Sequence, residues 1–211
     1  MIDRGTTSRP PPPRVGGDDG AVLVEAALVL PLMLIIVLGI FDFGIAWRQT
    51  RIMSSALGNA ARQVASSQDA RHADLFALQS FMATMNDTES TVPTKVVIYR
   101  ANSTGAPFSA SCLTTTPSSG TSGVAGNCNI YGPNQLANLT TANFGVATDT
   151  SCASANYDSR WCPKNRNVTQ GAPPDFVGIY SEATFTPLSQ VWGATYTFDD
   201  RVVTQIEPKV V

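Results

Sequence analysis

The chain has 211 residues, a length that allows one ordinary domain with an appendage. Charged residues make up 14% of the sequence, against about 25% in a typical soluble domain. The net charge is −2 and the basic residues are scattered, so we expect no nucleic-acid partner. A single histidine, His72, excludes most histidine-rich metal sites and leaves one imidazole for any catalytic triad.

Residues 1–20 form a proline-rich leader that contains the runs RPPPPR and GGDDG. Proline-rich composition favours an extended, solvated segment that cannot build a core. We expect this segment to be a cytoplasmic leader, which a processing peptidase could remove.

Residues 21–47 are apolar except for Glu25 and Asp42. As a helix this segment reaches about 40 Å, which exceeds the hydrocarbon core of about 30 Å. It therefore predicts a transmembrane helix. A secretory signal peptide is the competing interpretation, but its apolar region spans only about 7–15 residues before small residues at the cleavage site. Here the run is far longer and ends in Trp47 and Arg48.

The orientation of the span follows from the cysteines, because arginines flank both of its ends in similar number. All four cysteines come after the span, in a stretch rich in Ser, Thr, Gly and Asn: Cys112, Cys128, Cys152 and Cys162. An even set at such spacings indicates a disulfide framework, and short loop closure favours Cys112–Cys128 and Cys152–Cys162. Disulfides need an oxidising compartment, so we expect a single-pass protein of the cell membrane with its N-terminus in the cytoplasm. Free cytoplasmic thiols are the alternative, and a zinc site is less favoured since no close Cys or His pair occurs.

Residues 48–92 are expected to form an amphipathic helical region with a break in the polar stretch 66–74. Apolar residues recur at helical spacing on both sides of that break: Met53, Leu57, Ala60 and Val64, then Leu75, Leu78, Met82 and Met85. This stripe can pack on the chain's own C-terminal domain or on a partner helix, and the sequence favours neither.

Residues 93–211 are expected to form an extracytoplasmic β-rich domain. Strands are predicted at residues 95–100, 175–186, 193–198 and 201–206, with Asp199-Asp200 as a turn between the last two. Residues 101–174 contain the cysteines and are predicted to be an irregular, loop-rich insertion. The expected fold is α+β: one transmembrane helix extends into a long amphipathic helix, which packs on a small antiparallel sheet.

Glu25 is the most informative residue of the span, because a carboxylate in an apolar helix is costly and marks a functional site. Gly20 is followed by four apolar residues and then Glu25, a pattern that resembles the processing site of type IV pilins and pseudopilins. The wider stretch, with Pro31, Gly39 and the Asp42-Phe43-Gly44 ending, resembles the TadE-like proteins of Tad-type pilus systems.

The resemblance implies cleavage by a prepilin peptidase between Gly20 and Ala21, and intramembrane assembly through Glu25, Pro31 and Asp42. Each residue also has a plainer interpretation. Glu25 and Asp42 could lie at the two headgroup layers, and Pro31 could simply kink the helix. The chain departs from the processing motif in having Ala26 where an aromatic residue often follows the glutamate, and in its long leader.

The sequence contains no recognised catalytic or nucleotide-binding motif, so we expect neither an enzyme nor a cofactor or metal. His72 lies in a polar stretch and is predicted to be solvated. The leading hypothesis is a minor pilin or pseudopilin that contacts the membrane, other pilin-like subunits and the assembly machinery. The alternative is a membrane-anchored surface binding protein or adhesin, whose cysteine-containing domain recognises a ligand.

Overall fold

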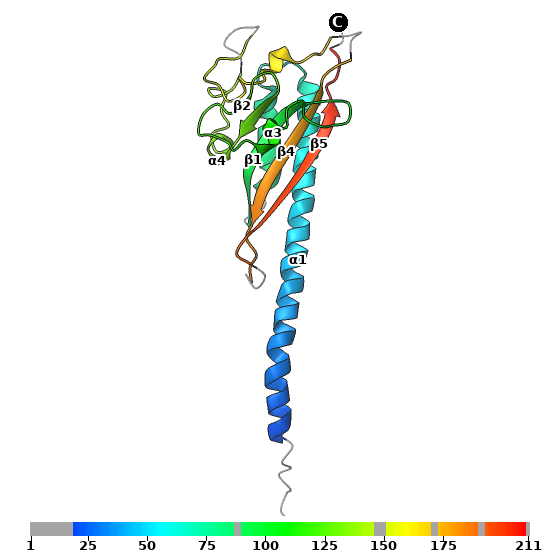
Figure 1. The fold of residues 1–211 in the computed structure, drawn as a ribbon, viewed down its shortest axis with the longest axis vertical. Coiled ribbons are helices and arrows are strands. Elements are labelled where there is room, and N and C mark those ends of the chain that lie inside the picture. Colours follow the sequence, from blue (N-terminus) through cyan, green and yellow to red (C-terminus); the bar gives the residue numbers. More distant parts are fainter. Residues whose placement is uncertain (1–18, 87–89, 146–150, 170–172, 190–192, 210–211) are drawn as a thin grey trace, which may run out of the picture.

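The computed structural model describes residues 19–86, 90–145, 151–169, 173–189 and 193–209; the leader up to residue 18 lies outside them. The chain begins with one very long helix, α1 (Asp19–Ser67), followed by α2 (Ala73–Met85). Figure 1 shows α1 projecting far below an α+β domain that packs against only its C-terminal part. The α+β fold predicted from the sequence is confirmed.

The break between the two helices occurs where the sequence predicts it. Gln68 follows α1 with φ 53°, a left-handed conformation that ends helices, and the next residues turn the chain. In α2 the buried residues Leu75, Leu78, Phe81 and Met85 recur at helical spacing. They pack against the C-terminal part of α1, where Met53, Leu57 and Val64 are fully buried.

A five-stranded antiparallel sheet has the strand order β2-β3-β1-β4-β5. The strands are β1 (Thr91–Ala101), β2 (Gly123–Val124), β3 (Cys128–Tyr131), β4 (Phe176–Phe185) and β5 (Tyr196–Gln205). Short helices complete the insertion: α3 (Ser111–Thr114), α4 (Pro133–Leu136) and the 3-10 helix η1 (Pro163–Asn165). The helices α1 and α2 cover one face of the sheet, and the main core lies between them and β1 and β4.

The central strand β1 is buried on both faces, which fits its apolar sequence KVVIY. On the face away from α1 and α2, Tyr99 packs with Val97, Cys112, Cys128 and Ile130 in a second, smaller cluster. Tyr99 pairs with Gly178 of β4, and a Cβ atom at position 178 would lie 2.1 Å from its ring. Glycine is therefore required there by the close approach of the tyrosine.

Two details of the predicted sheet are wrong. Asp199-Asp200 is not a turn, because β5 runs through both residues, and the Ser54 hydroxyl of α1 donates a hydrogen bond to Asp200 Oδ2 (2.5 Å). This hydrogen bond from α1 thus helps to hold the acidic pair within β5. The insertion 101–174 is also less irregular than predicted, since it supplies β2 and β3 to the sheet edge.

The structure contains the disulfides Cys112–Cys128 and Cys152–Cys162, the pairing that short loops favour. The first joins α3 to β3, and both of its cysteines are buried in the second cluster. The second connects two segments of the insertion that lie beside β3. Each bond therefore fixes part of the insertion that has few other regular elements.

We predict that alkylation of the native protein modifies no thiol, whereas reduction before alkylation exposes four; intact-mass analysis checks this. Replacing Cys112 and Cys128 together by Ser should lower the free energy of unfolding by about 3 kcal/mol, because the closed loop holds about 15 residues. Four alkylated thiols without reduction would contradict both the pairing and the oxidising compartment.

Candidate functional site

The first part of α1, residues 20–41, has an apolar surface that the rest of the chain leaves uncovered. All of its side chains are exposed except half-buried Leu38 and Gly39. This part has a mean hydropathy of 2.8 over its most apolar window, none of which is buried. Its length of about 33 Å matches a hydrocarbon core of about 30 Å. α1 is thus long and apolar enough to span a membrane before the α+β domain begins.

Glu25 is the single ionisable residue between Gly20 and Phe41. Its side chain is exposed, and among the described residues it has no hydrogen-bonding or ion-pairing partner. In an apolar environment an unpaired carboxylate is expensive. The described residues of the chain provide no positive partner for Glu25.

The Gly20–Ala21 bond lies in the first turn of α1, and a Cβ atom at Gly20 would meet nothing within 4 Å. Among the described residues, nothing covers this bond. Six positions after Glu25 comes Pro31, through which α1 continues without interruption. Proline leaves the carbonyl of Ala27 without its helical donor, so this turn is locally weakened.

Asp42 has a different environment, because the chain itself provides its partners. Its side chain is only 6% exposed. Oδ1 accepts hydrogen bonds from the backbone N–H of Leu188 (3.2 Å) and of Ser189 (3.4 Å), and Oδ2 accepts one from the Ser189 hydroxyl. Asp42 thereby fastens the segment that follows β4 to α1, at the point where α1 becomes buried.

The structure does not bring the three predicted assembly residues together. Glu25 and Asp42 are separated by about 26 Å along α1, with Pro31 between them on the exposed surface. Asp42 is the boundary residue between the exposed part of α1 and its packed part, residues 42–67. Glu25 is the one charged group that remains available to a neighbour within the exposed part.

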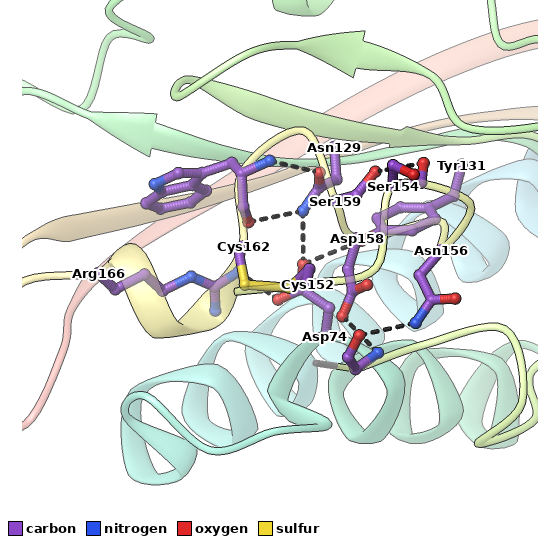
Figure 2. Close-up of a disulfide and its surroundings, with 12 residues drawn as sticks. Asp74, Asn129, Tyr131, Cys152, Ser154, Asn156, Asp158, Ser159, Cys162 and Arg166 are labelled. Atoms are coloured by element: carbon purple, nitrogen blue, oxygen red, sulfur yellow. Dashed lines mark hydrogen bonds and ion pairs between the residues drawn. A yellow bond between two sulfur atoms is a disulfide. The ribbon is translucent and has the colours of Figure 1, made fainter. Parts of the chain in front are cut away.

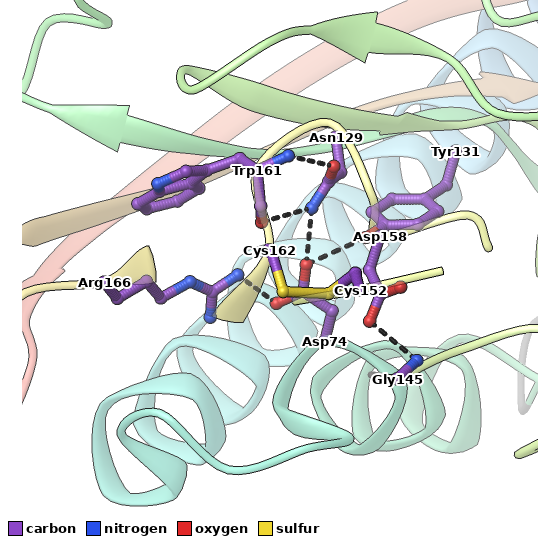
Figure 3. Close-up of polar contacts among 9 residues, drawn as sticks. All are labelled: Asp74, Asn129, Tyr131, Gly145, Cys152, Asp158, Trp161, Cys162 and Arg166. Atoms are coloured by element: carbon purple, nitrogen blue, oxygen red, sulfur yellow. Dashed lines mark hydrogen bonds and ion pairs between the residues drawn. A yellow bond between two sulfur atoms is a disulfide. The ribbon is translucent and has the colours of Figure 1, made fainter. Parts of the chain in front are cut away.

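A buried polar cluster, which sequence analysis missed, lies beside the Cys152–Cys162 disulfide (Figures 2 and 3). Asp74 of α2 forms an ion pair with Arg166, and neither side chain is exposed to solvent. Asn129 and Tyr131 of β3 each donate a 2.9 Å hydrogen bond to Asp74 Oδ2. The cluster joins α2, β3 and the segment after η1. The sequence feature that could have indicated this cluster is Asp74, an acidic residue within the apolar face of a helix.

Asp158 is a second buried acid in this cluster. Its Oδ2 accepts a hydrogen bond from the backbone N–H of Gly145 (2.9 Å), whereas Oδ1 has no partner among the described residues. Burial disfavours its charged form, and the nearby Asp74 carboxylate adds repulsion, so the pKa of Asp158 is raised to about 7. The same causes raise the pKa of Tyr131 well above its usual value.

The cluster is buried, so it holds the insertion against the helices rather than meeting a substrate. Among the described residues, no group of three His, Cys, Asp or Glu side chains is placed to hold a metal ion. His72 is half-buried in the turn before α2, not fully solvated as the sequence suggests. It lies against Gly145, where a Cβ atom would be 2.9 Å from its Nε2.

A comparison with protein-family models matches residues 20–65 to the family described as TadE-like protein. The match covers the exposed part of α1 and nearly all of its packed part, and it confirms the resemblance seen in the sequence. Searches of curated proteins and of solved structures each found no match. Together with the apolar helix, the match supports a membrane-anchored component associated with a Tad pilus.

We predict that Asp42→Ala loosens the β4–β5 connection from α1, because three hydrogen bonds to a carboxylate are lost. The free energy of unfolding should fall by about 2–3 kcal/mol, and a protease should cut more readily near Leu188. Urea unfolding and limited proteolysis in detergent measure the two effects. Asp200→Ala is the matched control, since it removes a carboxylate partner of α1 without touching this connection. Equal cleavage near Leu188 in both variants would contradict the role of Asp42.

The raised pKa of Asp158 predicts a specific pH dependence of stability. The folded state disfavours the carboxylate, so stability from this group is highest below about pH 4 and falls as the pH rises toward about 7. Asp158→Asn should therefore lose less stability than the parent protein between about pH 5.5 and about pH 8. Thermal unfolding at the two pH values checks this, and an identical loss in both proteins would show that Asp158 is not the titrating group.

Proposed function

We propose that this chain, whose residues 20–65 are TadE-like, is a structural or assembly component of a Tad-type pilus, acting as a minor pilin or pseudopilin. The observation that carries the proposal is the exposed part of α1, an apolar surface with one unpaired carboxylate. Such a helix is suited to both environments that a pilin-like subunit occupies, the lipid bilayer and a bundle of neighbouring apolar helices.

In this proposal a prepilin peptidase cleaves between Gly20 and Ala21 and creates a new N-terminal amine. Glu25 then lies four residues, about 6 Å along the helix axis, from the amine of its own chain. A neighbouring subunit displaced by one such step places its amine against Glu25. The pairing matters because a single buried charge is strongly destabilising, whereas two opposite charges compensate each other.

The disulfides support an orientation with the α+β domain outside the cytoplasm, because they persist in oxidising compartments. The N-terminus and Gly20 then face the cytoplasm, and α1 crosses the cell membrane once. Asp42 lies at the outer end of the span and keeps the base of the domain on α1. The partners in this proposal are the membrane, other pilin-like subunits, the assembly machinery and the peptidase.

We predict that Glu25→Gln inserts into the membrane normally but fails to co-assemble with its pilus partners. The amide keeps the shape and polarity of the side chain and removes only the charge. Membrane fractionation measures insertion, and co-purification of pilin-like subunits after cross-linking measures assembly. Ala26→Gln is the matched control, because it adds the same amide at the next position and leaves Glu25 intact.

N-terminal sequencing of the parent protein should show a mature chain that starts AVLVE where a matching peptidase is present. Retention of residues 1–20 together with normal assembly of Glu25→Gln would contradict the proposal. The helix would then serve as a tether, and a surface binding protein would become the better interpretation.

A further inference from the structure

A groove of about 660 Å³ lies between α1 and the end of the β4–β5 hairpin. One wall is the helix face that carries Ile36, Ile40 and Phe43, and the other is formed by Phe185, Tyr196 and Phe198. Asp42 also borders the groove, but its carboxylate already accepts hydrogen bonds from Leu188 and Ser189. The space is therefore lined almost entirely by apolar side chains.

The groove is continuous with the lipid-facing surface of α1. Ile36 and Ile40 belong to the exposed part of the helix, whereas Thr50, at the other end, belongs to the packed part. Phe43 is 71% exposed and Tyr196 41% exposed, so the groove is open along its side. If residues 20–41 lie in the bilayer, the groove begins within the hydrocarbon and extends through the headgroup layer, to about 13 Å beyond the hydrocarbon edge.

The two ends of the groove differ in polarity. Trp47 lies four residues after Phe43 and Arg51 four residues after Trp47, so all three belong to neighbouring positions on one side of the helix. The Arg51 guanidinium lies over the Trp47 ring, 4.7 Å from its centroid, and both side chains are exposed. A cation thus lies beyond the domain end of the groove, while the membrane end is purely aliphatic. This polarity matches an amphiphile with a negative head.

We propose that the groove binds one acyl chain of an anionic membrane phospholipid, with the lipid phosphate near Arg51. The volume falls within the range of about 300–1,000 Å³ typical of small-molecule sites. The proposal rests on the membrane anchorage of α1 but not on the role in a pilus.

The test uses the full chain in vesicles of phosphatidylcholine and phosphatidylglycerol, in which a fraction of either lipid carries a photoactivatable group on its acyl chain. Flotation first establishes that the protein is membrane-bound. After illumination, mass spectrometry of the digest locates the cross-linked lipid. We expect lipid on the β5 peptide that contains Tyr196 and Phe198, since both side chains line the groove.

Two pairs of variants sharpen the test. Ala46→Leu fills the groove and should reduce labelling of the β5 peptide about fivefold or more, whereas Ala27→Leu makes the same change on the exposed part of α1 and should leave it unchanged. Arg51→Gln should abolish the preference for labelled phosphatidylglycerol over labelled phosphatidylcholine. Arg62→Gln removes an exposed arginine of α1 about 16 Å further along the helix axis than Arg51 and should retain that preference.

Labelling confined to α1 in floated protein would overturn the proposal and leave the anchorage intact. An Ala46→Leu variant whose β5 peptide is labelled as strongly as that of the parent protein would also overturn the proposal. Loss of β5 labelling at high protein-to-lipid ratio, with a cross-link between two copies at the groove, would assign the groove to a second copy instead. Failure of the protein to float would contradict the anchorage itself, and the lipid site with it.

Discussion

One helix in this protein must satisfy two environments, and the rest of the structure follows from that constraint. α1 has 49 residues, of which the first part exposes an apolar surface interrupted only by Glu25 and the second part is packed into an α+β domain. Water cannot solvate the exposed surface without a large free-energy cost, because burial of apolar area is the main stabilising term in folding. The exposed part therefore needs lipid or other apolar helices around it.

The domain is arranged to begin where that surface ends. Asp42 holds the segment after β4 against α1, and Ser54 contacts Asp200 of β5 three turns further on. Behind these contacts, the packed part of α1 shares its core with α2 and the sheet. The insertion depends on different interactions, namely two disulfides and the ion pair between Asp74 and Arg166. These add to the apolar contacts of Tyr131, Phe144 and Trp161, which belong to the main core.

Sequence analysis predicts the features that arise from local patterns and misses those that need a distant partner. Composition and periodicity predict three such features, and the structure contains them: the apolar run around Glu25, the break after Ser67 and the strand KVVIYR. The strand through Asp199 and Asp200 was missed because the acidic pair is held there by pairing with β4 and by a hydrogen bond from Ser54, 146 residues away in the chain. Strand β3 was missed because it lies in a polar, glycine-rich stretch and is held by pairing with β1. The partners of Asp74 are likewise more than fifty residues distant.

The central claim is that the boundary between lipid and the folded domain lies near Asp42, and spin labelling tests it most directly. Because the four native cysteines are paired, a single added cysteine can be labelled selectively. Leu28→Cys, Leu34→Cys, Ile40→Cys, Arg48→Cys and Ser55→Cys sample exposed positions along α1 in vesicles. The first three labels should be relaxed mainly by dissolved oxygen, and the last two mainly by a water-soluble relaxation agent. A label at Leu34 that behaves as in water, or one at Ser55 that behaves as in lipid, would contradict the account.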